Sequence, residues 1–141
     1  MSKIKIALVT LALGATVAFT SSAFAEKMKA TLDGKSETPP NASAGKGEAD
    51  IDYDAATKKL TWKLTYSGLS GPATAAHFHG PAEPGKNAGV AVAIPNATSS
   101  PVQGSATLTD AQAADLTAGK YYVNIHTAAN PAGEIRGQVT K

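Results

Sequence analysis

The sequence has 141 residues, no cysteine and a formal net charge of +2 with neutral histidine. Without cysteine, disulfides, a thiolate metal site and a cysteine nucleophile are all excluded. Lys3 and Lys5 account for the excess charge, so residues 26–141 are electrically balanced and offer no basic surface for nucleic acid.

The N-terminal residues have the pattern of a secretory signal peptide. A basic start precedes an apolar run over 6–19, and Ala23-Phe24-Ala25 provides a small-residue cleavage site. The alternative is a membrane anchor, but the apolar run is short for a span of about 20 residues. We therefore expect residues 1–25 to be removed as a signal peptide. Residues 26–141 should then form one secreted or periplasmic domain without a membrane span.

Short runs with the period of a β-strand follow one another along residues 26–141. In "EADIDY" (48–53) and "LTWKLTY" (60–66), apolar and polar residues alternate, so one face of each run is suited to burial. The polar link between these two runs indicates a hairpin loop. Further strand-like runs lie at 28–32, 76–79, 89–94, 104–109, 120–127 and 134–139.

Only one segment, 110–117, has a helical pattern. Thr109 or Asp110 is suited to cap its start and Gly119 to end it. Many short strands without crossover helices predict an all-β fold, either an antiparallel β-sandwich or a barrel, with Greek-key-like connections. We expect the core to contain five residues in particular: Trp62, Leu64, Val92, Val123 and Ile125.

The chain has three histidines, and two of them are close together. His77 and His79 lie in "AHFHG" on the opposite face from Phe78, and His126 lies on the polar face of "YYVNIHT". A spacing of two residues in a strand places His77 and His79 on one side, about 7 Å apart at Cα. If a neighbouring strand brings His126 alongside, the three imidazoles can converge on one ion.

Imidazole chemistry favours particular metals. Neutral imidazole binds borderline ions such as Cu(II), Zn(II) and Ni(II), and the affinity order of divalent ions favours Cu(II). A methionine site for Cu(I) is not expected, because Met1 and Met28 are the only methionines. Two readings stay open from the residues alone. Either the histidines bind a metal, copper first and zinc as the alternative, or they hydrogen-bond loop backbone and cap the turn at 127–133.

Two enzyme motifs are rejected. Residues 80–87, "GPAEPGKN", are close to a phosphate-binding loop, but Asn87 replaces the hydroxyl residue that would hold magnesium. Pro81 and Pro84 also lack the backbone N–H groups that a phosphate cradle needs. The G-x-S-x-G pattern of α/β-hydrolases is absent. We assign no catalytic residue.

Three stretches resemble the chordin-type CHRD domain: "LDGKSETPP", "AHFHGPAEPGKNAGVAVAI" and "LTAGKYYVNIHTAANPAGEIRGQV". They occur in the family's order, and the resemblance covers residues 27–139. It implies a β-sandwich module of the kind found in exported bacterial proteins and repeated in chordin, an extracellular antagonist of bone morphogenetic proteins. The family's histidines correspond to His77, His79 and His126, and its closing acid and arginine correspond to Glu134 and Arg136.

The resulting hypothesis is an exported, single-domain CHRD protein that binds a metal ion, with copper favoured, through His77, His79 and His126. Glu134 and Arg136 are candidates for supporting this site, by orienting an imidazole or gating an anion. The first alternative is an extracytoplasmic module that binds another protein and holds no metal. The second alternative is a copper-dependent redox enzyme acting on superoxide or peroxide.

Overall fold

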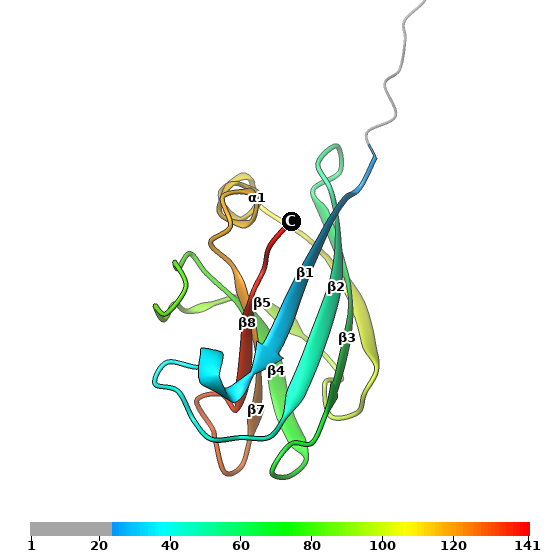
Figure 1. Cartoon of the computed structure of the whole chain (residues 1–141). Coiled ribbons are helices and arrows are strands. Elements are labelled where there is room, and N and C mark those ends of the chain that lie inside the picture. The colour runs from blue at the N-terminus through cyan, green and yellow to red at the C-terminus, as the bar shows by residue number, and fades with distance from the viewer. Residues whose placement is uncertain (1–23) are drawn as a thin grey trace, which may run out of the picture.

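The computed structural model describes residues 24–141 (Figure 1). Over this range the chain forms eight strands, one short 3-10 helix and one α-helix. In chain order they are β1 (Glu26–Asp33), η1 (Gly34–Ser36), β2 (Lys46–Asp54), β3 (Lys59–Ser67), β4 (Ala73–His79), β5 (Val90–Ile94), β6 (Val102–Thr107), α1 (Asp110–Thr117), β7 (Tyr122–Thr127) and β8 (Ile135–Gln138).

The described strands belong to one antiparallel sheet in the order β5-β4-β7-β8-β1-β2-β3-β6. The junction between β8 and β1 is narrow, because their ladder has one register pair, Asp33 with Arg136. The sheet therefore bends there into two halves and curls round the core as a nearly closed barrel (Figure 1). The prediction of an antiparallel all-β fold is confirmed.

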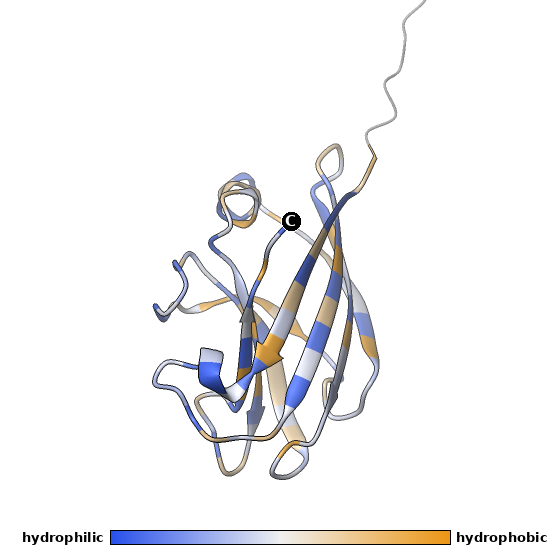
Figure 2. Ribbon diagram, viewed as in Figure 1, coloured by the Kyte–Doolittle hydropathy of each residue, from blue (hydrophilic) through white to orange (hydrophobic). Residues whose placement is uncertain are grey.

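The β2–β3 hairpin shows how alternation builds the core. Ile51 lies opposite Trp62 and both are buried, whereas their strand neighbours Asp50, Thr61 and Lys63 are exposed. Asp54 closes the loop by accepting a hydrogen bond from the Ala56 backbone N–H at 2.9 Å. Figure 2 shows the same alternation as hydrophobic and hydrophilic bands along β1 and β2.

Both halves of the sheet fill the core. Trp62 of β3 meets Phe78 of β4 edge to face, with ring centroids 5.3 Å apart. Four of the five predicted core residues are at most 3% exposed: Trp62, Leu64, Val123 and Ile125. The prediction for Val92 is confirmed only in part, because this residue packs against the core but is only partly buried. It lies on β5, an edge strand with a neighbour on one side, so the sheet covers it incompletely.

α1 forms where the sequence predicts a helix. The Thr109 side chain accepts from the Gln112 backbone N–H at 3.2 Å, and the Gln112 side chain accepts from the Thr109 N–H at 3.0 Å. This capping box begins the helix. Leu116 buries its side chain in the core, and Gly119 follows the helix end with φ 75°, a conformation that suits glycine.

The predicted signal peptide, residues 1–25, falls almost entirely outside the described residues, which begin at residue 24. Export of the protein therefore stays a prediction. Between residues 24 and 141, the fold includes no helix with the length and hydrophobicity of a membrane span.

Candidate metal centre

β4 and β7 are adjacent and antiparallel, and this pairing places the three histidines on one face of the sheet. His77 lies opposite Asn124, and His126 lies two positions further along β7. Side chains alternate along β4, so Phe78 enters the core at 0% exposure while His77 and His79 lie on the other face. The outer face of two neighbouring strands therefore carries all three imidazoles.

The imidazole nitrogens converge. Nδ1 of His77 lies 3.0 Å from Nε2 of His126, and candidate ligand atoms from His77, His79 and His126 all lie within 4.8 Å of one another. Two nitrogens bound to one ion at 2.0–2.1 Å are at most about 4.2 Å apart. A movement of less than about 1 Å would therefore turn this cluster into a set of metal ligands.

Backbone carbonyl groups orient two of the rings. Nδ1 of His79 lies 3.0 Å from the Ala88 carbonyl oxygen, and Nδ1 of His126 lies 2.9 Å from the Pro131 carbonyl oxygen. A carbonyl oxygen can only accept, so each Nδ1 donates its hydrogen and each Nε2 keeps its lone pair. His79 and His126 therefore offer their Nε2 atoms as ligands.

A stack of flat groups supports His79 from the side. The rings of His79 and Tyr122 are parallel to within 4°, with centroids 4.8 Å apart. The Arg136 guanidinium carbon lies 3.4 Å from the centroid of the Tyr122 ring. Because β7 lies between β4 and β8, His79 and Arg136 contact Tyr122 from opposite sides. Arg136 therefore contacts the His79 imidazole only indirectly, by way of the Tyr122 ring.

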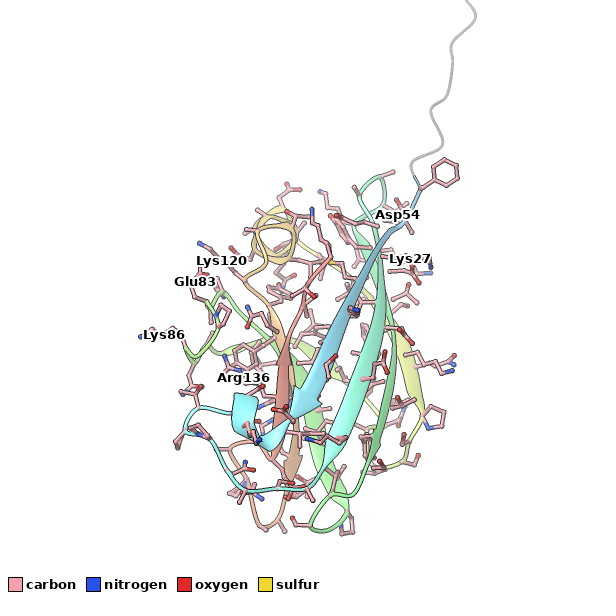
Figure 3. All side chains as sticks on the ribbon, viewed as in Figure 1. Lys27, Asp54, Glu83, Lys86, Lys120 and Arg136 are labelled. Carbon is pink, nitrogen blue, oxygen red and sulfur yellow. The ribbon has the colours of Figure 1, made fainter. Side chains whose placement is uncertain are left out.

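Arg136 is held in place by the loop between β4 and β5. Its side chain is 2% exposed and donates hydrogen bonds to Asn87 Oδ1, at 3.0 Å, and to the Lys86 carbonyl oxygen. Figure 3 shows Arg136 beside β8 and inside this loop, whereas Glu83 and Lys86 lie on its outer side. The same loop supplies the Ala88 carbonyl oxygen to His79, so Arg136 also anchors the segment that orients this ring.

Glu134 is connected to the histidine site less directly than Arg136. This residue is 0% exposed, and its carboxylate accepts hydrogen bonds from the Ser70 backbone N–H at 3.0 Å and the Asn130 side-chain amide at 2.9 Å. The second bond holds the turn at 127–133, and Pro131 in that turn orients His126. Glu134 is therefore connected to His126 through the backbone of this turn.

His77 and His79, the two histidines on β4, lie in surroundings that favour the neutral form of imidazole. Burial lowers the pKa of His77 below the ordinary value, and the charges of His126 and His79 lower it further. Burial also lowers the pKa of His79, although the hydrogen bonds that the protonated ring donates to Ala88 and Asn124 oppose this shift. The neutral form is the one that carries a lone pair for a metal ion.

Three residues near the histidines were not assigned to the site from the sequence. The strand pattern already puts Tyr122 and Asn124 on the same polar face as His126, and this shared face was the available signal. Glu37 is 6% exposed, and burial raises its pKa to about 6 against the opposing charge of Arg136. No local pattern marks Glu37, because it meets Arg136 and Asn124 only in the folded chain.

These features define a class of protein: an antiparallel β-barrel-like domain with three converging imidazoles on its outer face. A family model described as the CHRD domain matches residues 28–139. The chain therefore belongs to the CHRD domain family. Comparison with curated proteins and with solved structures gives no significant match.

Proposed function

We propose that this CHRD-domain protein binds a metal ion, with copper favoured, through His77, His79 and His126. The observation that carries the proposal is the convergence of three imidazole nitrogens within 4.8 Å on two adjacent strands. Nothing in the packing of the barrel requires these rings to meet, since the core residues of β4 and β7 point the other way. Two of the rings are also oriented by backbone carbonyl groups, as is usual for metal-binding histidines.

Ligand type supports copper before zinc. Three imidazoles suit both ions, but Cu(II) binds more tightly than the other divalent first-row metals at sites of nitrogen and oxygen ligands. The chain has no cysteine to favour zinc through thiolates. The predicted export of the protein would place such a site in an extracytoplasmic compartment, where the protein would hold or deliver the metal.

Metal titration tests the proposal. The purified protein should bind Cu(II) at one site in competition with a chelator of known affinity, and Zn(II) more weakly. His77→Ala, His79→Ala and His126→Ala should each weaken Cu(II) binding by more than the 10–100-fold typical of residues that only support a ligand. Lys63→Ala, at an exposed position on β3, is the control and should bind like the wild type.

The outcome of the titration also distinguishes metal binding from the rival function, a protein-interaction module. If the wild type shows no stoichiometric Cu(II) or Zn(II) binding, or if all three histidine variants bind like the control, the metal site is refuted. The protein is then better interpreted as an extracytoplasmic interaction module in which the histidines organise the sheet surface and the loops beside it.

A further inference from the structure

Asn124 completes the group of polar side chains around the histidines. It lies directly opposite His77 in the pairing of β4 with β7, and it is 2% exposed. Its side-chain oxygen Oδ1 lies 2.9 Å from Nε2 of His79, the nitrogen that this ring offers as a ligand. The four residues His77, His79, Asn124 and His126 therefore form one patch on two adjacent strands.

The hydrogen bonds around Asn124 and His79 leave an unusual contact. The Asn124 side-chain nitrogen lies 3.4 Å from the Ala132 carbonyl oxygen, which places the amide hydrogens there and leaves Oδ1 facing His79. When the ring is neutral and its Nδ1 donates to Ala88, Nε2 of His79 has no hydrogen. The lone pairs of Oδ1 and Nε2 thus face each other in a buried position. Two buried acceptors in this arrangement repel unless a proton or a metal cation lies between or beside them.

Two contacts within the patch have the spacing of neighbouring ligands on one metal ion. Two ligands bound at 2.0–2.1 Å and at a right angle are about 2.9 Å apart. Two pairs of candidate ligand atoms have this spacing. Asn124 Oδ1 lies 2.9 Å from His79 Nε2, and His77 Nδ1 lies 3.0 Å from His126 Nε2. Right angles among nitrogen and oxygen ligands are characteristic of tetragonal Cu(II).

We propose that Oδ1 of Asn124 is a fourth ligand of the metal ion, completing a set of three nitrogens and one oxygen. This inference rests on the proposed three-histidine site and adds a ligand to it. With this fourth ligand the site should prefer Cu(II) over Cu(I). An amide oxygen is a hard donor that suits Cu(II), whereas Cu(I) prefers soft donors and gains little from it.

Substitution of Asn124 tests the assignment. Cu(II) and Cu(I) affinities should be measured separately for the wild type, Asn124→Ala and Asn124→Asp, by competition with chelators specific for each oxidation state. Asn124→Ala should weaken Cu(II) binding by at least about 10-fold and leave Cu(I) binding nearly unchanged, so the ratio of the two affinities falls. Asn96→Gly, at an exposed turn residue with φ 59°, is the matched control and should change neither affinity.

Asn124→Asp keeps the shape of the side chain and serves if the alanine variant unfolds. Because a carboxylate replaces a neutral amide, the Cu(II) electron paramagnetic resonance spectrum of Asn124→Asp should differ from that of the wild type. An unchanged spectrum would refute the ligand, as would equal losses of Cu(II) and Cu(I) affinity in Asn124→Ala, which indicate a residue that only positions His79. If Asn124→Ala loses neither Cu(II) nor Cu(I) affinity, Asn124 is not a ligand and a proton occupies its contact with His79. Failure of the wild type to bind Cu(II) would instead refute the three-histidine site.

Discussion

Nδ1 of His77 lies 3.0 Å from Nε2 of His126, although 49 positions separate the two residues in the chain. The contact exists because β4 pairs with β7 in the folded sheet, so the unfolded chain has no such site. A metal ion held between these strands would therefore bind the native state in preference to the unfolded state. Such a ligand stabilises the fold by RT ln(1 + L/Kd), where L is its free concentration and Kd its dissociation constant.

Addition of Cu(II) should raise the free energy of unfolding. At a free concentration 100 times the dissociation constant, the expected gain is about 2.7 kcal/mol. Thermal unfolding with and without Cu(II) measures it, and His126→Ala should lose most of the gain. An equal gain in wild type and His126→Ala would contradict binding at this site.

Metal affinity should depend on pH in the acidic range. Protons compete for the lone pairs that bind the ion, so affinity should be constant at neutral pH and fall in acid. Burial lowers the pKa of His77 and His79, so protons compete for these two rings mainly below the ordinary histidine value of about 6.5. Competition titrations between pH 5 and 8 measure the profile. A loss that is already steep at pH 6.5 would contradict the lowered pKa of His77 and His79.

Trp62 should be among the most important core residues for stability. It is 3% exposed and meets Phe78 across the barrel, so truncation leaves a cavity between the two halves of the sheet. Trp62→Ala should lower the free energy of unfolding by about 3–5 kcal/mol. Lys63→Ala, the next residue on the same strand but exposed, should change it by less than about 0.5 kcal/mol. Denaturant unfolding provides the comparison, and a loss under about 1 kcal/mol for Trp62→Ala would contradict its burial.

Much of the fold is predictable because the strand pattern is local. The alternation in 48–53 and 60–66 decides which side chains enter the core, and the structure buries Ile51, Trp62 and Leu64 accordingly. The same reasoning places the histidines on the outer face. Val92 shows the limit of this approach, since its burial depends on whether a strand has one neighbour or two, and sequence period carries no information on sheet order.

The candidate site is predictable only in part. A spacing of two residues guarantees that His77 and His79 share a face, but it does not say which strand lies beside them. The approach of His126 depends on the pairing and register of β4 with β7, which join distant segments. Roles that depend on three-dimensional neighbours are harder still. The stack of Tyr122 on His79 and the burial of Glu37 beside Arg136 have no counterpart in local sequence.

Glu134 should matter for both stability and metal binding. Glu134→Gln keeps the shape but replaces one carboxylate oxygen with an NH2 donor, so an acceptor is lost and either the Ser70 N–H or the Asn130 amide faces a donor where it had a short hydrogen bond. We expect a loss of about 1–3 kcal/mol in the free energy of unfolding and a fall in Cu(II) affinity of about 10-fold, because the turn that orients His126 loosens. Denaturant unfolding measures the change in stability, and Cu(II) titration of the same preparation measures the change in affinity. A stability loss with fully retained affinity would show that the turn does not position His126.

Glu37 should make the stability of the protein depend on pH in the opposite sense to a carboxylate whose pKa is lowered by folding. Its pKa is raised from 4.5 to about 6, mainly by burial, so the folded state holds the proton more tightly than the unfolded state. Its contribution is therefore fully present below pH 4.5 and is lost as pH rises through 6. Glu37→Gln cannot ionise, so at pH 7 it should raise the free energy of unfolding by up to about 2 kcal/mol, with little change at pH 4. Urea unfolding at both pH values measures the difference, and Glu48→Gln, at an exposed position on β2, is the control. A lower stability of Glu37→Gln at pH 7 would show instead that attraction to the buried Arg136 outweighs the cost of burying the carboxylate.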